Sequence, residues 1–348
     1  MTVKINKPAV NLREELNELK KPTGVAGEAM LRAETPQEQF NLIGAGRKNL
    51  IINGGFDVWQ RGTSFAPAAG YGYSADRARL SYNSGAGDTV TNITKQTATV
   101  DGKFVNVLRH SIVTTTNTRQ VRYNHRLESP TYLTNQTVTL SFWVRASRTV
   151  ALDGGSSIGD NGTGNLATIA LSLGEATTTW TRKIATVTLG DCSASSYLTL
   201  VVGHTSSGAN VDIDYAMFQL ELGTVATPFE HRSYGEELAL CQRYFNRLGG
   251  ATYTGITTGM VFSNTAALFC ITYPVPMRGS PTISNSNLVV SDRISYDSAI
   301  TSFQPQGSST TGMQFKTVHA SNSASARQAV ILCVQSSGTG YMDFNAEL

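Results

Sequence analysis

Alternation of apolar and polar residues dominates the chain from Asn49 onward. It is clearest in TVTLSFWVRAS (residues 137–147) and in VDIDYAMFQLEL (residues 211–222). This period-2 pattern is typical of antiparallel strands that bury one face, and turns rich in Gly, Asn and Ser separate the segments. Roughly ten such segments precede residue 233, so the pattern predicts a mainly β chain with a two-sheet sandwich of jelly-roll type.

The stretch NLIINGGFDVWQRG (residues 49–62) opens this region. Residues 50–52 are apolar and predict a short buried strand at one edge of the sandwich. The Gly54-Gly55 pair permits backbone geometry with positive φ, and Phe56 then returns an apolar side chain to the core. The three tryptophans stand within apolar alternation, so we place all of them in the core: Trp59, Trp143 and Trp180.

Residues 1–48 differ from the rest and predict two short helices. One follows Asn11, a weak capping box with Glu14, and the other begins with Thr35 as N-cap and Pro36 at the first helical position. Helices this short are only marginally stable in isolation. We therefore expect this arm either to pack on its own domain or to act as an anchor that becomes ordered on a larger assembly. The apolar anchor residues are Leu12, Leu16, Leu19, Phe40 and Ile43.

The segment HRSYGEELALCQRYFNRLGG (residues 231–250) predicts a helix that Ser233 caps and the final glycine pair ends. Its apolar residues recur at alternating spacings of four and three: Tyr234, Leu238, Cys241, Phe245 and Leu248. Two heptads of this kind favour either a trimeric neck between domains or packing on a neighbouring sheet. The predicted organisation is an arm (1–48), a sandwich (49–232), a neck (233–249) and a smaller β domain (250–348).

Composition excludes several classes of function. Only 15% of the 348 residues are charged and the net charge is +3, so the basic footprint of a nucleic-acid-binding protein is missing. We also expect no membrane span, because no apolar run is long enough, and the N-terminus lacks the apolar centre of a signal peptide. The four cysteines are too scattered for a zinc site or a disulfide framework, and we expect buried thiols: Cys192, Cys241, Cys270 and Cys333.

The sequence offers no convincing catalytic group. The five histidines stand singly, and neither a metal-binding histidine motif nor a serine-nucleophile elbow is present. Two carboxylate pairs could serve a glycosidase, Asp153 with Asp160 and Asp212 with Asp214, but a Gly-rich turn and a strand edge explain them equally well. We therefore expect a protein that is not an enzyme.

The sandwich resembles carbohydrate-binding jelly rolls, which often begin N-L-x-x-N-G-x-F and end in a strand like VDIDYAMFQLELG. That resemblance implies a possible structural calcium, the only cofactor expected, at Asp57, Asp212 and Asp214, although a surface acid pair remains the alternative. It also implies sugar stacking by AGYGYSADRAR (residues 69–79), unless the tyrosines pack on their own sheet. The candidate glycan-binding residues are Tyr71, Tyr73, Arg77 and Arg79.

Longer stretches resemble fibre proteins of short-tailed bacteriophages from aquatic bacteria. They are LRAETPQEQFNLIGAGRKNLIINGGFDVWQRGTSF, ATPFEHRSYGEELALCQRYF, YPVPMRGSPT and YMDFNAEL. The resemblance implies a virion component, usually a homotrimer, assembled in the bacterial cytoplasm. Its arm would bind other virion proteins of the tail, the portal region or the capsid, and its distal domain would meet a host-surface glycan. A polysaccharide-degrading spike enzyme and a capsid decoration protein without a receptor role remain the alternatives.

Overall fold

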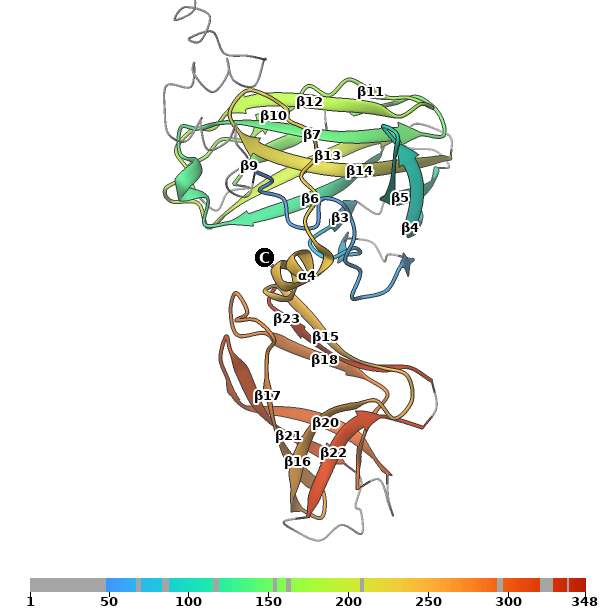
Figure 1. Cartoon of the computed structure of the whole chain (residues 1–348), viewed down its shortest axis with the longest axis vertical. Coiled ribbons are helices and arrows are strands. Elements are labelled where there is room, and N and C mark those ends of the chain that lie inside the picture. The colour runs from blue at the N-terminus through green and yellow to red at the C-terminus, as the bar shows by residue number, and fades with distance from the viewer. Residues whose placement is uncertain are drawn as a thin grey trace, which may run out of the picture.

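The computed structural model contains two β domains joined by one short helix, α4 (Figure 1). It describes residues 48–66, 70–82, 88–114, 119–152, 155–160, 164–206, 210–292, 297–319, 328–336 and 338–348. The predicted N-terminal helices, with Leu12, Leu16, Leu19, Phe40 and Ile43, lie outside the described residues. The mainly β fold predicted from alternation is confirmed.

The first domain is a sandwich of two antiparallel sheets. The six-stranded sheet has the order β1 (Ser64–Phe65), β4 (Asp88–Val100), β5 (Lys103–Thr114), β14 (Val211–Leu222), β7 (Thr137–Ala146) and β12 (Thr181–Thr188). The eight-stranded sheet runs β10 (Ile169–Ala170), β9 (Ser157–Gly159), β13 (Tyr197–Ser206), β6 (Arg119–Glu128), β3 (Arg79–Tyr82) and β2 (Gly70–Tyr73). Off this path, β8 (Val150–Ala151) pairs with β13, and β11 (Glu175–Ala176) pairs with β8. A 3₁₀ helix, η1 (Pro130–Leu133), leads into β7.

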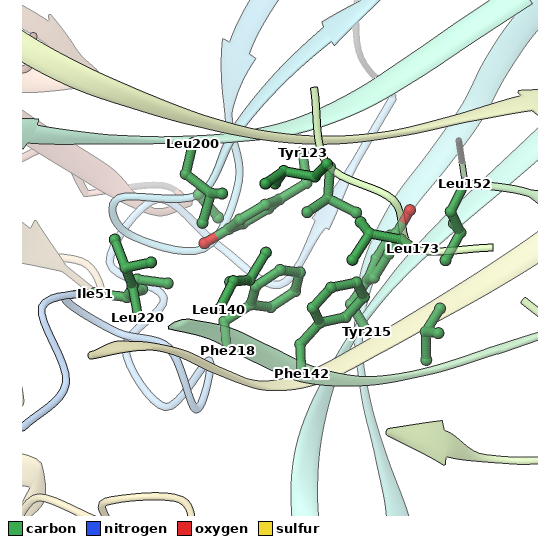
Figure 2. Packing of buried hydrophobic residues seen from close by; sticks show 14 of the residues in the cluster. Ile51, Tyr123, Leu140, Phe142, Leu152, Leu173, Leu200, Tyr215, Phe218 and Leu220 are labelled. Carbon is green, nitrogen blue, oxygen red and sulfur yellow. The ribbon is translucent and has the colours of Figure 1, made fainter. Parts of the chain in front are cut away.

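Aromatic side chains from both sheets meet in the centre of the sandwich (Figure 2). The Phe142 and Phe218 rings stack with centroids 4.5 Å apart, and Tyr123 stacks on the other side of Phe218 at 4.4 Å. Because successive residues of a strand point to opposite faces, β7 presents every second residue to this core, and β14 does so on each side of an irregularity between Ala216 and Gln219 that brings both Tyr215 and Phe218 inside. The aromatic stack therefore joins strands that are distant in sequence.

Three histidines are buried in the same sandwich: His110, His125 and His204. The Nδ1 atom of His204 lies 3.1 Å from the hydroxyl of Tyr215, and His110 packs edge-on against the Tyr215 ring. Burial disfavours the charged imidazolium, so it lowers the pKa of His110 to about 4 and the pKa of His204 well below its usual range. These histidines are neutral parts of the core at neutral pH.

The opening stretch is a turn, and the strand predicted at residues 50–52 is wrong. Asn49 holds this turn on β14, because its Nδ2 donates to the carbonyl of Phe218 while its Oδ1 accepts from the backbone N–H of Leu220. Gly54 approaches the same strand so closely that a Cβ would lie 2.1 Å from the Phe218 oxygen. The glycine is required for this close approach rather than for a positive φ.

The helix is shorter than predicted. α4 spans Tyr234–Gln242, and Ser233 caps it by accepting a hydrogen bond from the N–H of Glu236, as predicted. Phe245 and Leu248 lie in strand β15 (Phe245–Gly250), because the chain turns at residues 243–244 and pairs with β23 (Gly340–Asn345).

The predicted heptad seam is therefore wrong. Tyr234 is 60% exposed, whereas Cys241 and Phe245 are buried. Because Phe245 and Leu248 lie in a strand and the other three residues in a helix, the five residues share no continuous helical face. Packing within the protein accounts for Cys241 and Phe245, which are buried, but not for Tyr234.

The second domain combines a small sheet with a barrel. β15, β23 and β18 (Thr282–Ser286) form the three-stranded sheet next to α4. The closed barrel follows the order β16 (Gly255–Ser263), β17 (Ala266–Thr272), β21 (Gly312–His319), β20 (Asp297–Ser308), β19 (Leu288–Ser291) and β22 (Ala329–Val334). Stacked Phe269 and Phe315 rings lie in its core.

The buried histidines predict acid-dependent unfolding. Below about pH 6.5 the unfolded chain protonates His110, whereas the folded protein resists protonation down to about pH 4, so stability falls across this interval. His110→Leu should reduce the slope of unfolding free energy against pH by up to about 1.4 kcal/mol per pH unit in that window. His231→Leu, at an exposed histidine, is the control in denaturant titrations from pH 7 to 4.5. Parallel curves for wild type and His110→Leu would contradict the prediction.

Candidate functional site

Four separate parts of the chain meet between the two domains. The opening stretch, the turn around Asp76, helix α4 and the C-terminal residues converge there, and the C-terminal end of the chain lies beside α4 (Figure 1). Gln60 donates from Nε2 to the carbonyl of Phe245 at 2.8 Å, and Arg243 pairs with Glu128 at 2.7 Å. We call this region the junction.

Arg77 is at the centre of the junction and is only 1% exposed. Its guanidinium pairs with Glu347, donates to the carbonyl of Arg126 and lies 3.6 Å from the centroid of the Tyr244 ring. The prediction that Arg77 contacts a glycan is wrong, because the side chain has no path to solvent. It instead joins the sandwich to the C-terminal residues.

Arg61 completes the ionic network of the junction. It pairs with Asp76 at 2.9 Å and with Glu347 at 3.3 Å, and it lies 3.5 Å above the centroid of the Phe245 ring. Burial raises the pKa of Asp76 to about 6, and the charge of Arg61 opposes that rise. Two guanidinium groups therefore share the single carboxylate of Glu347.

An open pocket of about 370 Å³ lies beside this network. The sandwich and the C-terminal domain both line it, through Gly72, Tyr73, Arg79, Thr282, Asn345, Glu347 and Leu348. The Tyr73 hydroxyl donates to the backbone oxygen of Leu348 at 3.1 Å. Two of the predicted glycan-binding residues, Tyr73 and Arg79, thus come together in one pocket. Tyr71 pairs with Ser81 through the backbone, and its side chain lies outside the described parts.

The outward side of the six-stranded sheet carries a second group of functional interest. Arg109, Asp214 and Arg145 are neighbours across three strands, since Asp214 of β14 pairs with Arg109 of β5 and with Arg145 of β7. Arg109 donates to both Asp214 oxygens at 2.7 and 2.9 Å, and Arg145 donates to one of them at 2.9 Å.

Tryptophans flank this charged row. The Arg145 guanidinium lies 4.9 Å from the centroid of the Trp180 ring. Trp143 and Trp180 are half-buried over Val107 and Met217, in a small apolar cluster separate from the sandwich core. The prediction of a core position is therefore wrong for these two residues. We define the outer-face cluster as Arg109, Trp143, Arg145, Trp180 and Asp214.

The position of Trp59 agrees better with the prediction that the tryptophans lie in the core. It packs at the edge of the sandwich core, where its ring stacks on Phe65, and its Nε1–H donates to the Phe56 carbonyl at 2.7 Å.

The prediction of buried thiols is confirmed for three of the four cysteines. Cys270 is exposed on β17, so the prediction is wrong for that residue.

The three carboxylates proposed for calcium do not fit a metal site. Both oxygens of Asp214 already bind guanidinium groups, and Asp57 accepts from Asn106 at 2.6 Å. Asp212 lies 3.9 Å from Arg109, which would repel a cation. Within the described ranges, no group of three or more His, Cys, Asp or Glu side chains could hold a metal ion.

The carboxylate pairs considered for hydrolysis have structural partners. Asp160 is buried and accepts from the N–H of Leu166 and the hydroxyl of Ser195. Asp153, its possible partner, lies outside the described residues. Asp214 is bound in the outer-face cluster.

In the part of the chain that the structure describes, no helix has the length and apolar character needed to cross a membrane.

Comparisons with known proteins give only structural neighbours. No protein-family model matches this chain, and no curated protein matches it. A family 61 carbohydrate-binding module in complex with β-1,4-galactotriose is 11% identical, with a TM-score of 0.30, over 51% of this chain and all of the module. The xylan-binding domain of a Paenibacillus barcinonensis protein is 14% identical, with a TM-score of 0.28, over 47% of this chain and 94% of that domain.

A third neighbour is the family 11 carbohydrate-binding module from Clostridium thermocellum in complex with a β-1,3-1,4-mixed-linked tetrasaccharide. It is 13% identical, with a TM-score of 0.26, over 47% of this chain and all of the module. TM-scores of 0.30 and below do not establish what this chain binds.

Alternation could have located part of the outer-face cluster. In TLSFWVRAS the core residues Leu140, Phe142 and Val144 alternate with Trp143 and Arg145, so the tryptophan belongs to the opposite face. The partnership with Arg109 and Asp214 had no such signal, because it depends on strand order. The pairing of Arg77 with Glu347 likewise joins residues 270 positions apart.

The junction depends on its shared carboxylate. Glu347→Gln should lower the unfolding free energy by about 3 kcal/mol, because it leaves the buried guanidinium of Arg77 without a counter-charge. Glu175→Gln, at an exposed carboxylate on β11, should change stability by less than about 0.5 kcal/mol. Denaturant titration at pH 7 measures both. Equal stabilities for the two variants would contradict the role given to Glu347.

Proposed function

We propose that this chain is a non-enzymatic, glycan-binding subunit of a bacteriophage virion fibre. The observation that carries the glycan part is the outer-face cluster, where two half-buried tryptophans flank a fixed row of two guanidinium groups and one carboxylate. Pyranose rings have apolar faces and polar edges, and this arrangement offers a complementary surface for each.

The chemistry of the cluster suits a sugar. Trp143 and Trp180 supply flat apolar surface at low conformational cost, and the guanidinium of Arg145 supplies several donors in one plane. Arg109 and Arg145 keep 29% and 37% of their side chains exposed, whereas Asp214 is 4% exposed. The buried carboxylate therefore orients both cations, which remain partly exposed.

The hydrogen-bond partners of Asp214 and Asp160 favour glycan binding over glycan hydrolysis. A glycosidase needs one carboxyl group as acid and a second as base or nucleophile, both facing the substrate. Asp214 instead binds two cations, and Asp160 holds a loop through Leu166 and Ser195. A polysaccharide-degrading spike enzyme therefore remains the less favoured alternative.

The virion part of the proposal is supported by where the fibre-like stretches lie in the fold. DVWQRG, ALCQRYF, PMRG and FNAEL all contribute to the junction, through residues such as Arg61, Tyr244, Arg278 and Glu347. A fibre needs a body and a tip held in one rigid unit, and the junction provides that connection. Host-surface attachment, the arm's binding to other virion proteins and a homotrimeric state belong to this proposal. A capsid decoration protein remains the alternative location.

Residues of the outer-face cluster should control glycan binding. On an array of bacterial-surface polysaccharides, followed by titration with the best ligand, Trp180→Ala should weaken binding about tenfold because a stacking surface is lost. Tyr132→Ala, at a tyrosine that is 55% exposed on η1, is the matched control and should bind as wild type does. Unchanged affinity in Trp180→Ala, with a wild-type melting temperature, would remove this surface as the glycan site.

The arm should be needed for incorporation and not for folding. A chain lacking residues 1–46 retains Asn49 and its contacts with β14, so both β domains should fold with wild-type melting temperature. The same deletion should abolish incorporation into phage particles, measured by complementation and by immunoblot of purified virions. Normal incorporation of the shortened chain would refute the anchoring role.

A further inference from the structure

We propose that Phe229 is a third aromatic surface of the glycan site, and that the site takes a chain of several linked sugar units laid across the strands rather than a single sugar. The inference rests on the proposed function, because it concerns the same outer-face cluster. It adds the loop of residues 223–230 to the site. This loop follows β14 and returns over the outward side of the six-stranded sheet, where it contacts Gln219 and Glu221.

Two parallel rows of side chains cross the strands on this side of the sheet. The polar row is Arg145, Asp214 and Arg109. The next outward residues along β7 and β14 are Trp143 and Ala216, which pair with each other. Outward residues two positions apart on one strand are separated by about 7 Å. An apolar row therefore runs beside the polar row, and a sugar chain lying across the strands can place ring faces on one row and hydroxyl groups on the other.

Phe229 belongs to the apolar row. It packs on the same small cluster as Trp143 and Trp180, and all three side chains are half-buried. Each ring therefore covers the cluster with one side and keeps part of its surface accessible. His231 packs edge-on against the Phe229 ring, with centroids 4.9 Å apart, and restricts its movement.

Phe229 lies on the β5 side of β14, whereas the two tryptophans belong to the β7 and β12 side. A Cβ on Gly55 would lie 3.5 Å from the Phe229 ring, and Asp57, two residues further on, accepts a hydrogen bond from Asn106 of β5. In the sheet order, β14 separates β5 from β7 and β12, so three strand spacings, about 14 Å in all, lie between β5 and β12. This distance exceeds one pyranose ring, so contact with both ends of the row requires linked sugar units.

Buried hydrogen bonds fix the loop that carries Phe229. Glu221, which is 4% exposed, accepts from the backbone N–H and the hydroxyl of Thr227 at 2.8 and 2.7 Å. Gln219 is fully buried, donates to the Thr227 hydroxyl at 3.1 Å and accepts from the N–H of Glu230 at 2.8 Å. These bonds hold the chain on both sides of Phe229, so Gln219 and Glu221 are positioning residues. A ring that is fixed before a ligand arrives loses little conformational entropy on binding.

The test uses sugar chains of different length. The polysaccharide that binds best on the array is partly hydrolysed with acid, and single sugars and fragments of about six units are titrated separately into the full chain by calorimetry. Wild type should bind the long fragment at least about tenfold more tightly than the single sugar. Phe229→Leu keeps an apolar cover over the cluster but removes the flat ring. It should bind the long fragment about fivefold more weakly than wild type and the single sugar equally well.

Two further comparisons control for unspecific effects. Phe104→Leu, at a phenylalanine of β5 that is 76% exposed, should bind both probes as wild type does. Thr227→Val removes the hydroxyl that joins Glu221 to Gln219 and should weaken binding of the long fragment about threefold. Thr224→Val, at an exposed threonine of the same loop, should leave that affinity unchanged.

The outcomes separate this inference from the proposed function. If Trp180→Ala weakens glycan binding and Phe229→Leu does not, the extended site is wrong and the glycan site at the tryptophans stands. If no polysaccharide binds, or if neither variant changes affinity, both proposals are wrong. Equal affinities of wild type for the single sugar and the long fragment, or an equal loss for both probes in Phe229→Leu, would also overturn the extended site.

Discussion

The buried ion pair between Arg77 and Glu347 is the interaction on which the arrangement of the two domains depends. An uncompensated guanidinium is very costly to bury, so the C-terminal residues must stay beside the sandwich as long as Arg77 is inside. Arg61 strengthens the constraint, because it shares Glu347 with Arg77 and also neutralises Asp76. The C-terminal domain therefore has a fixed position relative to the sandwich rather than a flexible tether.

This constraint explains the two candidate sites in different ways. The junction pocket exists only because the domains are held together, since residues of both domains line it. The outer-face cluster depends instead on strand order within one sheet, which places Arg109, Asp214 and Arg145 side by side. The first site would disappear if the domains separated, whereas the second requires only the intact sandwich.

Arg77 and Phe245 differ from their predicted roles for one reason. A local sequence pattern indicates secondary structure, but the role of a charged or aromatic side chain depends on neighbours that are distant in the sequence. Arg77 in a Gly-rich loop suggested an exposed ligand contact, yet Glu347 and Tyr244 enclose it. The heptad-like spacing through Phe245 predicts a longer helix, but residues 245–250 form strand β15 because pairing with β23 stabilises the extended backbone more than helical propensity stabilises a helix there.

The sequence by itself determined the local features of the protein: the strands of the sandwich, the Ser233 cap of α4 and the alternation that separates Phe142 from Trp143. These follow from the period of the side chains and from hydrogen bonds within one turn, which a few residues specify. Only the tertiary structure decided that Arg77 meets Glu347, that Asp214 binds two arginines and that Tyr73 and Arg79 face one pocket. Those contacts join segments far apart in the chain, and their existence depends on strand order and domain packing, which no local pattern encodes.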